Sequence, residues 1–142
     1  MNARSLKNLT DVHPALVGVV TRAEELIALA PPIGVLGFIV TEGVRTLVRQ
    51  TQLVAAGASQ TMRSRHLTGH AVDLAATMNG TVRWDWPLYD KLAIAMKAAA
   101  AEQKVAIEWG GDWKMRDGPH FQLTWKDYPS EPKSREPDQR SA

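Results

Sequence analysis

Two short polar clusters hold three of the four histidines in the sequence and carry residue types from which a metal site can be built. In the first cluster, His66 lies in a polar loop and Asp73 follows seven residues later, inside an apolar segment. In the second cluster, His120 follows Asp117 by three residues. A catalytic zinc ion takes three protein ligands and keeps a fourth position open for water. His66, Asp73 and His120 are therefore candidate metal ligands.

Hydrolytic chemistry at such a site also needs a base beside the metal. Zinc lowers the pKa of a bound water to about 7, and a nearby carboxylate can take the proton and later return it to a leaving amine. Asp117 is the candidate for this role because it stands close to His120, and Pro119 between them restricts the backbone. The chain has no cysteine, so any metal must be held by histidine and carboxylate side chains.

Spacing alone leaves other ligand choices open. Single histidines are more often packed or surface residues than metal ligands, and composition does not separate His13 or His70 from His66. We leave His70 out because, in an extended segment, its side chain points away from that of Asp73. Asp73 is favoured over other carboxylates because an unpaired charge inside an apolar strand would be costly.

Helical and extended patterns alternate irregularly along the chain, which indicates an α+β fold. Helical spacing of apolar residues predicts a first helix over residues 11–29, capped by Asp11. A second helix is expected over residues 44–57, with Arg45 on its polar face. A third, alanine-rich helix is expected to carry Pro87 in its first turn. Extended segments are predicted at residues 33–41, 70–75, 105–109 and 120–125, the last two as a hairpin-like pair.

Length and composition favour one globular domain. The chain has 142 residues, and we expect a catalytic domain over residues 1–125 followed by a disordered polar tail over residues 126–142. A formal net charge of +2 gives no basic stripe for nucleic acid. The most apolar stretch, residues 33–40, is far shorter than the roughly 20 residues of a membrane helix, and no secretory signal is evident. We therefore expect no nucleic-acid binding and no stable membrane association.

The residues around the first cluster match a family pattern. Ser64, His66, Gly69, Ala71 and Asp73 form the motif Ser-x-His-x-x-Gly-x-Ala-x-Asp, and His120 stands in a Pro-His-Phe block. With these motifs the chain resembles the VanY-like zinc peptidases, which include D-Ala-D-Ala carboxypeptidases and the phage L-alanyl-D-glutamate endopeptidases. Further matching blocks lie at residues 12–14, 41–46, 49–50 and 109–113, so the resemblance spans residues 12 to about 125.

The resemblance implies a fold and a set of site residues. The fold is a single α+β domain of the D-Ala-D-Ala metallopeptidase or hedgehog type, with a small antiparallel sheet and flanking helices. One catalytic zinc ion is held by His66, Asp73 and His120. Asp117 matches the general base and acid, at a position where many relatives have glutamate. Arg45 matches an arginine near the metal that could stabilise an oxyanion, and the alternative is a solvated arginine on a helix face.

Two more residues are candidates for substrate binding, with their roles open. Ser64 could hydrogen-bond the substrate, orient a metal ligand or only shape the turn. Trp113 could line the cleft or belong to the core.

The activity implied by the resemblance is hydrolysis of the peptide stems of bacterial peptidoglycan. We expect first an L-alanyl-D-glutamate endopeptidase that acts as a phage endolysin in host lysis. It would be a monomer, kept in the cytoplasm of the producing cell until a separate membrane-permeabilising protein opens the way to the cell wall. The alternatives are a D-alanyl-D-alanine carboxypeptidase of cell-wall metabolism and, in another class, a non-catalytic zinc-stabilised wall-binding or virion structural module. A fourth protein ligand, such as His13 or His70, would favour the structural module.

Overall fold

An antiparallel sheet forms the centre of the protein, whose computed structural model describes residues 1–59 and 61–130. The strand order is β1-β2-β5-β4, and the short β3 pairs with β2. The strands are β1 (Leu36–Glu42), β2 (Ala71–Met78), β3 (Thr81–Val82), β4 (Ile107–Trp109) and β5 (His120–Leu123). This sheet and its flanking helices confirm the predicted α+β fold, and the predicted pairing of the last two strands is also confirmed.

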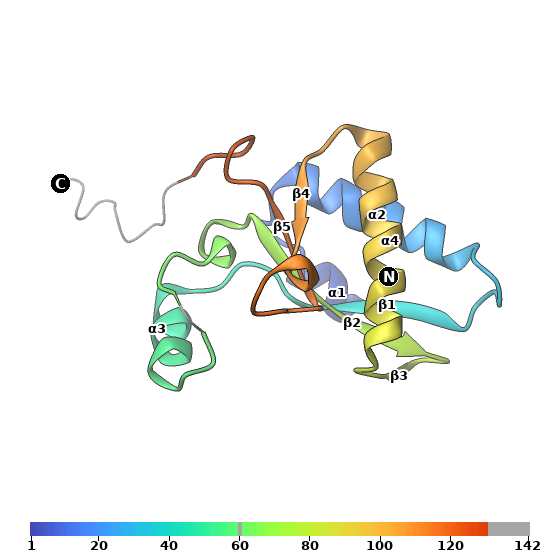
Figure 1. Ribbon diagram of the computed structural model, residues 1–142, viewed down its shortest axis with the longest axis horizontal. Coiled ribbons are helices and arrows are strands. Elements are labelled where there is room, and N and C mark those ends of the chain that lie inside the picture. Colours follow the sequence, from blue (N-terminus) through green and yellow to red (C-terminus); the bar gives the residue numbers. More distant parts are fainter. Residues whose placement is uncertain (60, 131–142) are drawn as a thin grey trace.

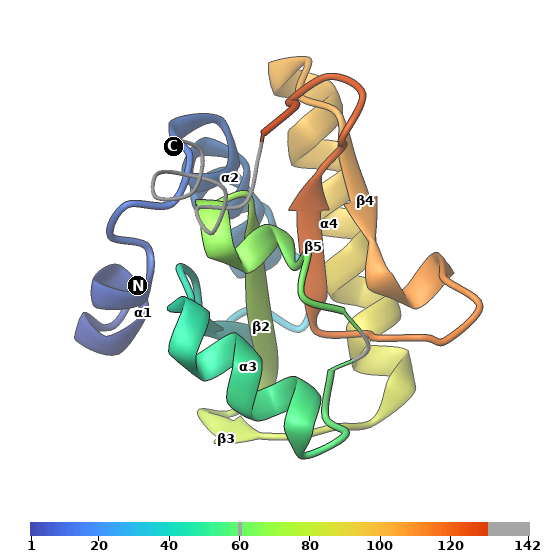
Figure 2. The same cartoon turned by 90° about the vertical axis from the view of Figure 1, so that its left-hand side faces the viewer.

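The helices lie on both sides of the sheet. The two long helices, α2 (Pro14–Ala28) and α4 (Trp86–Gln103), pack against each other on one face, and α3 (Leu47–Ala55) lies over the other (Figures 1 and 2). The shorter elements are α1 (Ala3–Asn8) and the 3₁₀ helices η1 (Arg65–Thr68) and η2 (Gly110–Asp112). No helix within the described residues is long and apolar enough to cross a membrane.

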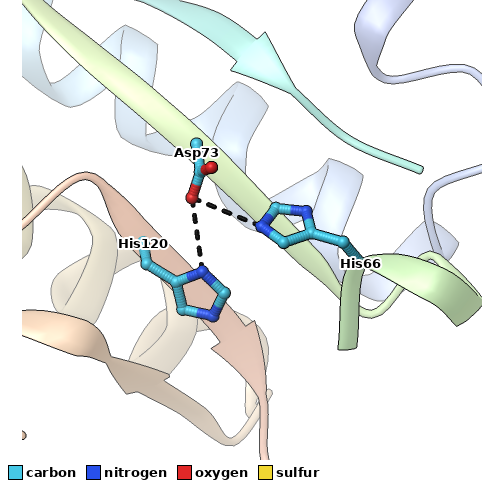
Figure 3. Close-up of side chains that lie close together, drawn as sticks. All are labelled: His66, Asp73 and His120. Atoms are coloured by element: carbon cyan, nitrogen blue, oxygen red, sulfur yellow. Dashed lines mark hydrogen bonds and ion pairs between the residues drawn. The ribbon is translucent and has the colours of Figure 1, made fainter. Parts of the chain in front are cut away.

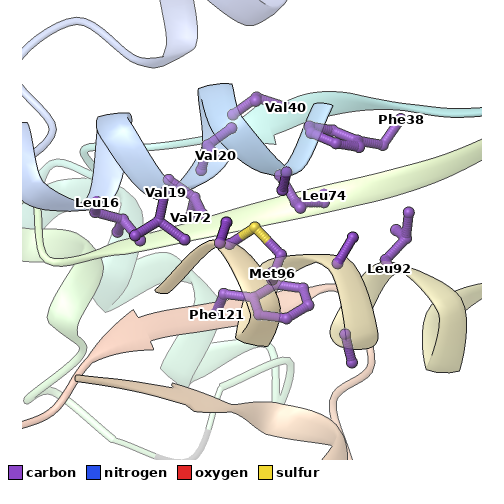
Figure 4. Packing of buried hydrophobic residues seen from close by; sticks show 14 of the residues in the cluster. Leu16, Val19, Val20, Phe38, Val40, Val72, Leu74, Leu92, Met96 and Phe121 are labelled. Atoms are coloured by element: carbon purple, nitrogen blue, oxygen red, sulfur yellow. The ribbon is translucent and has the colours of Figure 1, made fainter. Parts of the chain in front are cut away.

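Alternation along the strands gives the sheet one apolar face and one polar face. Val72, Leu74 and Phe121 are fully buried in the core, whereas Asp73 and His120 point to the opposite face. Figure 4 shows these three core residues packed with side chains of the two long helices, among them Leu16, Val19, Val20, Leu92 and Met96. The core therefore fixes the strands whose other face carries the candidate ligands.

The edge strand β1 is covered by α1, which the sequence patterns did not predict. Ser5 Oγ accepts a hydrogen bond from Val40 N at 2.9 Å, and Asn8 Nδ2 donates to Val40 O at 2.9 Å. These contacts replace the partner strand that an edge strand lacks. A helix of six residues that buries only Ser5 shows no apolar stripe, so hydrophobic spacing could not reveal it.

Two predicted helix starts are wrong. Helix α2 begins at Pro14, and its cap is His13, whose side chain accepts a hydrogen bond from Ala15 N. Asp11 stands before this cap in a left-handed conformation with φ of 64°. Helix α3 begins only after Thr46, which caps it, so Arg45 lies outside the helix instead of on its polar face.

The described structure continues past the domain boundary expected at residue 125. Tyr128 O accepts a hydrogen bond from Arg65 Nη2 at 2.7 Å, and the Tyr128 ring meets the His13 ring edge-on at 5.3 Å. The rest of the expected tail, residues 131–142, lies outside the described residues.

Candidate active site

A cleft opens on the polar face of the sheet. One side is formed by α3 and the segment after it, and the other by β4, β5 and the loop between them (Figure 2). The residues that line the cleft include all seven site residues singled out from the sequence, namely Arg45, Ser64, His66, Asp73, Trp113, Asp117 and His120. The structure therefore brings together side chains that lie up to 75 residues apart in the chain.

His66, Asp73 and His120 meet in this cleft (Figure 3). Asp73 Oδ1 lies 3.4 Å from His66 Nε2 and 3.3 Å from His120 Nδ1. The candidate ligand atoms of the three side chains all lie within 4.8 Å of one another. Asp73 and His120 are direct partners across β2 and β5, and His66 arrives on η1. Neither His13 nor His70 belongs to this cluster.

Hydrogen bonds on the outer side of each ring determine which imidazole nitrogen faces the carboxylate. His66 Nδ1 donates to Gly43 O at 2.8 Å, because a carbonyl can only accept, and this leaves Nε2 toward Asp73. His120 Nε2 donates to Gln122 Oε1 at 2.7 Å, which leaves Nδ1 toward Asp73. His66 Nε2 is buried and has no hydrogen-bond partner within the described part of the chain. Two imidazole nitrogens and a carboxylate oxygen thus converge, and this donor set fits a divalent metal ion.

The charges of the cluster are strongly coupled. Burial would raise the pKa of Asp73, but the hydrogen bond from His120 Nδ1 and the close approach of His66 Nε2 outweigh it and hold that pKa well below its usual range. Burial likewise opposes a charge on His120, yet its hydrogen bond to Asp73 raises the pKa of the ring above the ordinary value. The cluster is therefore built around a negative carboxylate that attracts positive charge into the space between the ligands.

Arg45 is fixed beside the cluster by residues that the sequence did not single out. Its Nε and Nη2 donate to the two carboxylate oxygens of Glu42 at 2.8 and 2.5 Å, and Nη1 donates to Gln50 Oε1 at 2.6 Å. Nη2 also lies 3.9 Å from Asp73 Oδ2. A guanidinium has five N–H donors, so one remains on each Nη. The side chain is only 9% exposed, and the alternative of a solvated helix-face arginine is wrong.

Glu42 also stabilises the charged form of Arg45. Burial lowers the pKa of Arg45, but the hydrogen bond and the charge of Glu42 more than offset it, and the net shift is upward.

Asp117 faces the cluster from the loop before β5. Its backbone N donates to Gly110 O at 2.9 Å, and its carbonyl accepts from His120 N at 3.2 Å. A Cβ at Gly110 would lie 2.4 Å from Asp117 O, so the loop can close this tightly only on glycine. The residue is exposed as a whole, but partial desolvation of its carboxyl and the negative charge of Asp73 raise the pKa of Asp117. A raised pKa suits a group that holds a proton during turnover.

Ser64 and Trp113 both line the cleft, and their roles toward a substrate stay predictions. Ser64 Oγ accepts a hydrogen bond from His66 N at 3.2 Å and caps η1, so it shapes the turn that carries this ligand. Trp113 is half-buried, and its ring centre lies 5.0 Å from that of His120.

Sequence reasoning missed the residues that orient the candidate ligands. Gln122 follows His120 by two positions, and strand alternation puts both on one face, so this partner could have been found. Gly43 was part of a matching block, but its close packing was not readable, since a Cβ there would lie 1.9 Å from Asn8 O. Gln50 lies in α3 and is fully buried, but the sequence pattern gives no sign that this polar side chain is buried.

An α+β fold with a His-Asp-His cluster beside a free carboxylate defines a candidate metallohydrolase. Residues 1–127 match the family described as phage L-alanyl-D-glutamate peptidase, and the chain belongs to this family. The resemblance seen in the sequence is confirmed.

Three relatives illustrate the similarity. The L-alanyl-D-glutamate peptidase of Escherichia phage T5 is 30% identical over 123 residues, which cover 84% of this chain and 85% of that protein. The L-alanyl-D-glutamate peptidase of Listeria phage A118 is 41% identical over 91 residues, or 63% of this chain, but the match spans only 31% of that protein. The crystal structure of the Serratia marcescens L-Ala D-Glu endopeptidase ChiX superposes with a TM-score of 0.83 at 49% identity, covering 92% of this chain and 93% of that one.

Proposed function

We propose that this protein hydrolyses the L-alanyl-D-glutamate bond in the peptide stems of bacterial peptidoglycan, with one zinc ion held by His66, Asp73 and His120. The observation that carries the proposal is the convergence of three ligand atoms, one of them the unpartnered His66 Nε2, beside the free carboxylate of Asp117. Histidine and carboxylate ligands suit zinc. The choice of bond is supported by the family and by the names of the relatives.

Each side chain has a defined task in this reaction. Bound zinc supplies a Lewis acid, which polarises the scissile carbonyl and lowers the pKa of water to about 7. Asp117 takes the proton of the attacking water and returns it to the leaving nitrogen, which breaks the peptide bond. Arg45 offers its two remaining N–H groups to the negative charge that develops on the carbonyl oxygen. Glu42 and Gln50 hold Arg45 in place for this task.

Two observations support an enzyme over a structural zinc module. The cluster has three candidate ligands within the described residues, whereas structural zinc sites are usually closed by four. Asp117 stands beside the cluster without belonging to it, and a purely structural site has no use for such a base.

The partner and location we propose follow from the family alone. The substrate is a peptidoglycan stem peptide, and the protein acts as a monomeric endolysin that reaches the cell wall after a separate protein permeabilises the membrane. Expression of the chain in bacteria tests this. Lysis should require co-expression of a membrane-permeabilising protein, and lysis by the chain alone would contradict this route.

The activity is tested by digestion of purified peptidoglycan with the zinc-loaded chain, with and without a chelator. Mass spectrometry of the released ends should show new N-terminal D-glutamate only without chelator. Free D-alanine would identify a D-alanyl-D-alanine carboxypeptidase instead. No product would favour the wall-binding module.

A further inference from the structure

Both chain neighbours of Asp117 contact one side chain, Trp86, which is the first residue of α4. On one flank, the Arg116 guanidinium stacks on the Trp86 ring, with Cζ 4.0 Å from the ring centre. On the other flank, Gly118 lies so close that a Cβ there would stand 2.9 Å from Cζ3 and 3.3 Å from Cη2 of this ring. The indole therefore holds the loop immediately before and immediately after the proposed base.

Hydrogen bonds attach the same two flanking residues to η2 and to the end of β4. Arg116 Nε donates to Gly111 O at 2.6 Å. Gly118 O accepts a hydrogen bond from Trp109 Nε1 at 2.7 Å, and this bond is buried. Each flank of the proposed base therefore has one hydrogen bond and one contact with the Trp86 ring.

Trp86 itself does not border the cleft. Within the described residues, the cleft lining includes Asp117 but no residue of α4. An effect of Trp86 on turnover must therefore pass through the loop. The Trp86 side chain is also 43% exposed and lies outside the hydrophobic core, as far as the chain is described. Its removal should therefore leave the fold intact.

We propose that Trp86 is a positioning residue that holds the loop on both sides of Asp117 and so keeps the Asp117 carboxyl beside the His-Asp-His cluster. This inference rests on the proposed function, in which Asp117 carries the proton from water to the leaving nitrogen. Proton transfer needs the two groups within hydrogen-bond reach, and a misplacement of about 1 Å can lower a rate about a hundredfold. Loss of Trp86 should therefore lower kcat and leave KM nearly unchanged.

Steady-state kinetics of the zinc-loaded chain on soluble peptidoglycan fragments test this role. Trp86→Ala should lower kcat roughly tenfold to hundredfold, with KM and zinc content close to those of the wild type. Trp86→Phe, which keeps an aromatic ring at this position, should recover part of the loss. In a chain that already carries Asp117→Asn, Trp86→Ala should cause no further loss, because the group that it positions is gone. A general structural defect would lower kcat by the same factor in both backgrounds.

Trp84→Ala is the matched control, because it removes an indole two residues away that is 64% exposed and stacks on Tyr89 instead of on the loop. Its kcat should equal that of the wild type. A wild-type kcat in Trp86→Ala, or an equal loss in the Asp117→Asn background, would overturn the inference and leave the proposed function intact. Loss of zinc in Trp86→Ala would also overturn it, because the effect would then lie in the metal site.

A wild-type chain that releases no product would contradict the proposed function by itself, and amide hydrogen exchange would then decide the inference. The Asp117 amide donates to Gly110 O at 2.9 Å. It should exchange faster in Trp86→Ala than in the wild type or in Trp84→Ala, because the loop opens more often. Equal exchange in all three chains would overturn the positioning of Asp117 by Trp86.

Discussion

The two walls of the cleft are held by different kinds of contact. The sheet wall, formed by β2, β5, β4 and the loop 110–119, carries Asp73 and His120 on strands whose other face is part of the core. The α3 wall, residues 47–59 and 61–64, has no such backing. Helix α3 buries only Gln50, and Val48 on the same helix is 68% exposed.

Polar contacts take the place of a core in the α3 wall. The Gln50 amide accepts from Arg45 through Oε1 and donates through Nε2 to Ser59 Oγ at 2.8 Å and to Thr61 O. Local stability follows the number of buried apolar contacts, so the α3 wall should open more readily than the sheet wall. The candidate metal ligands, whose geometry the proposed reaction depends on, lie on or against the sheet wall, and the α3 wall borders the rest of the cleft. Arg45 contacts both walls, because it donates a hydrogen bond to Gln50 in the α3 wall and lies close to Asp73 in the sheet wall.

The largest predicted effects concern the sheet wall and separate metal binding from proton transfer. His120→Ala should lose both zinc and activity, because it removes one of the three proposed ligands. Asp117→Asn should keep close to one zinc per chain and lower kcat about 10²- to 10⁴-fold, because only the proton carrier is lost. Metal analysis and steady-state kinetics on the same preparations measure both. Zinc loss in Asp117→Asn would make this residue a ligand.

A smaller effect is expected when the α3 wall is released. Gln50→Ala leaves the Arg45 Nη1 donor and the Thr61 carbonyl without their partner, at a cost of about 1–3 kcal/mol. Amide hydrogen exchange should become faster in α3 but not in β2 or β5, zinc content should stay near one, and kcat should fall because Arg45 is less well held. Gln52→Ala, an exposed position on the same helix, is the control. Equally faster exchange in β2 would show that the walls are not independent.

The difference between an apolar core behind the sheet wall and polar contacts in the α3 wall also explains how much of the site the sequence could predict. In the sheet wall, strand alternation and the spacing of polar residues made His66, Asp73 and His120 candidates, and the resemblance to a family motif selected this set, which the structure brings together. In the α3 wall, hydrophobic spacing showed an amphipathic helix but not which side the protein encloses. The enclosed side carries Gln50, and Arg45 lies outside the helix altogether. Hydrophobic periodicity in a sequence indicates which residues pack against an apolar core. It does not indicate which residues are buried in a wall that polar side chains hold in place.

Without metal, the coupled charges of the sheet wall should make stability depend on pH in both directions. The pKa of Asp73 is lowered on folding, so its contribution is present above about pH 3.9 and is lost as pH falls through the folded value. The pKa of His120 is raised, so its contribution is present below about pH 6.5 and is lost as pH rises through the folded value. Stability of the chelator-treated chain, measured by urea unfolding, should therefore be greatest between about pH 4 and 6.5.

Bound zinc should prevent the loss of stability as pH rises above about 6.5, because the ion takes the place of the proton between His120 and Asp73. The same urea series with bound zinc should stay level from about pH 6.5 to 8. An alkaline loss that is unchanged by zinc would contradict ligation by His120.

The smallest effect is expected from a matched pair of valines, one in each wall. Val72→Ala in β2 should lower the free energy of unfolding by about 2 kcal/mol, because it deletes two fully buried methyl groups and leaves a cavity. Val48→Ala in α3 should change it by less than about 0.5 kcal/mol, since the side chain is largely exposed and alanine favours helix. Urea unfolding of the chelated chain measures both. An equal loss in the two variants would mean that the apolar side of α3 is covered in solution, and the α3 wall would then be as firmly held as the sheet wall.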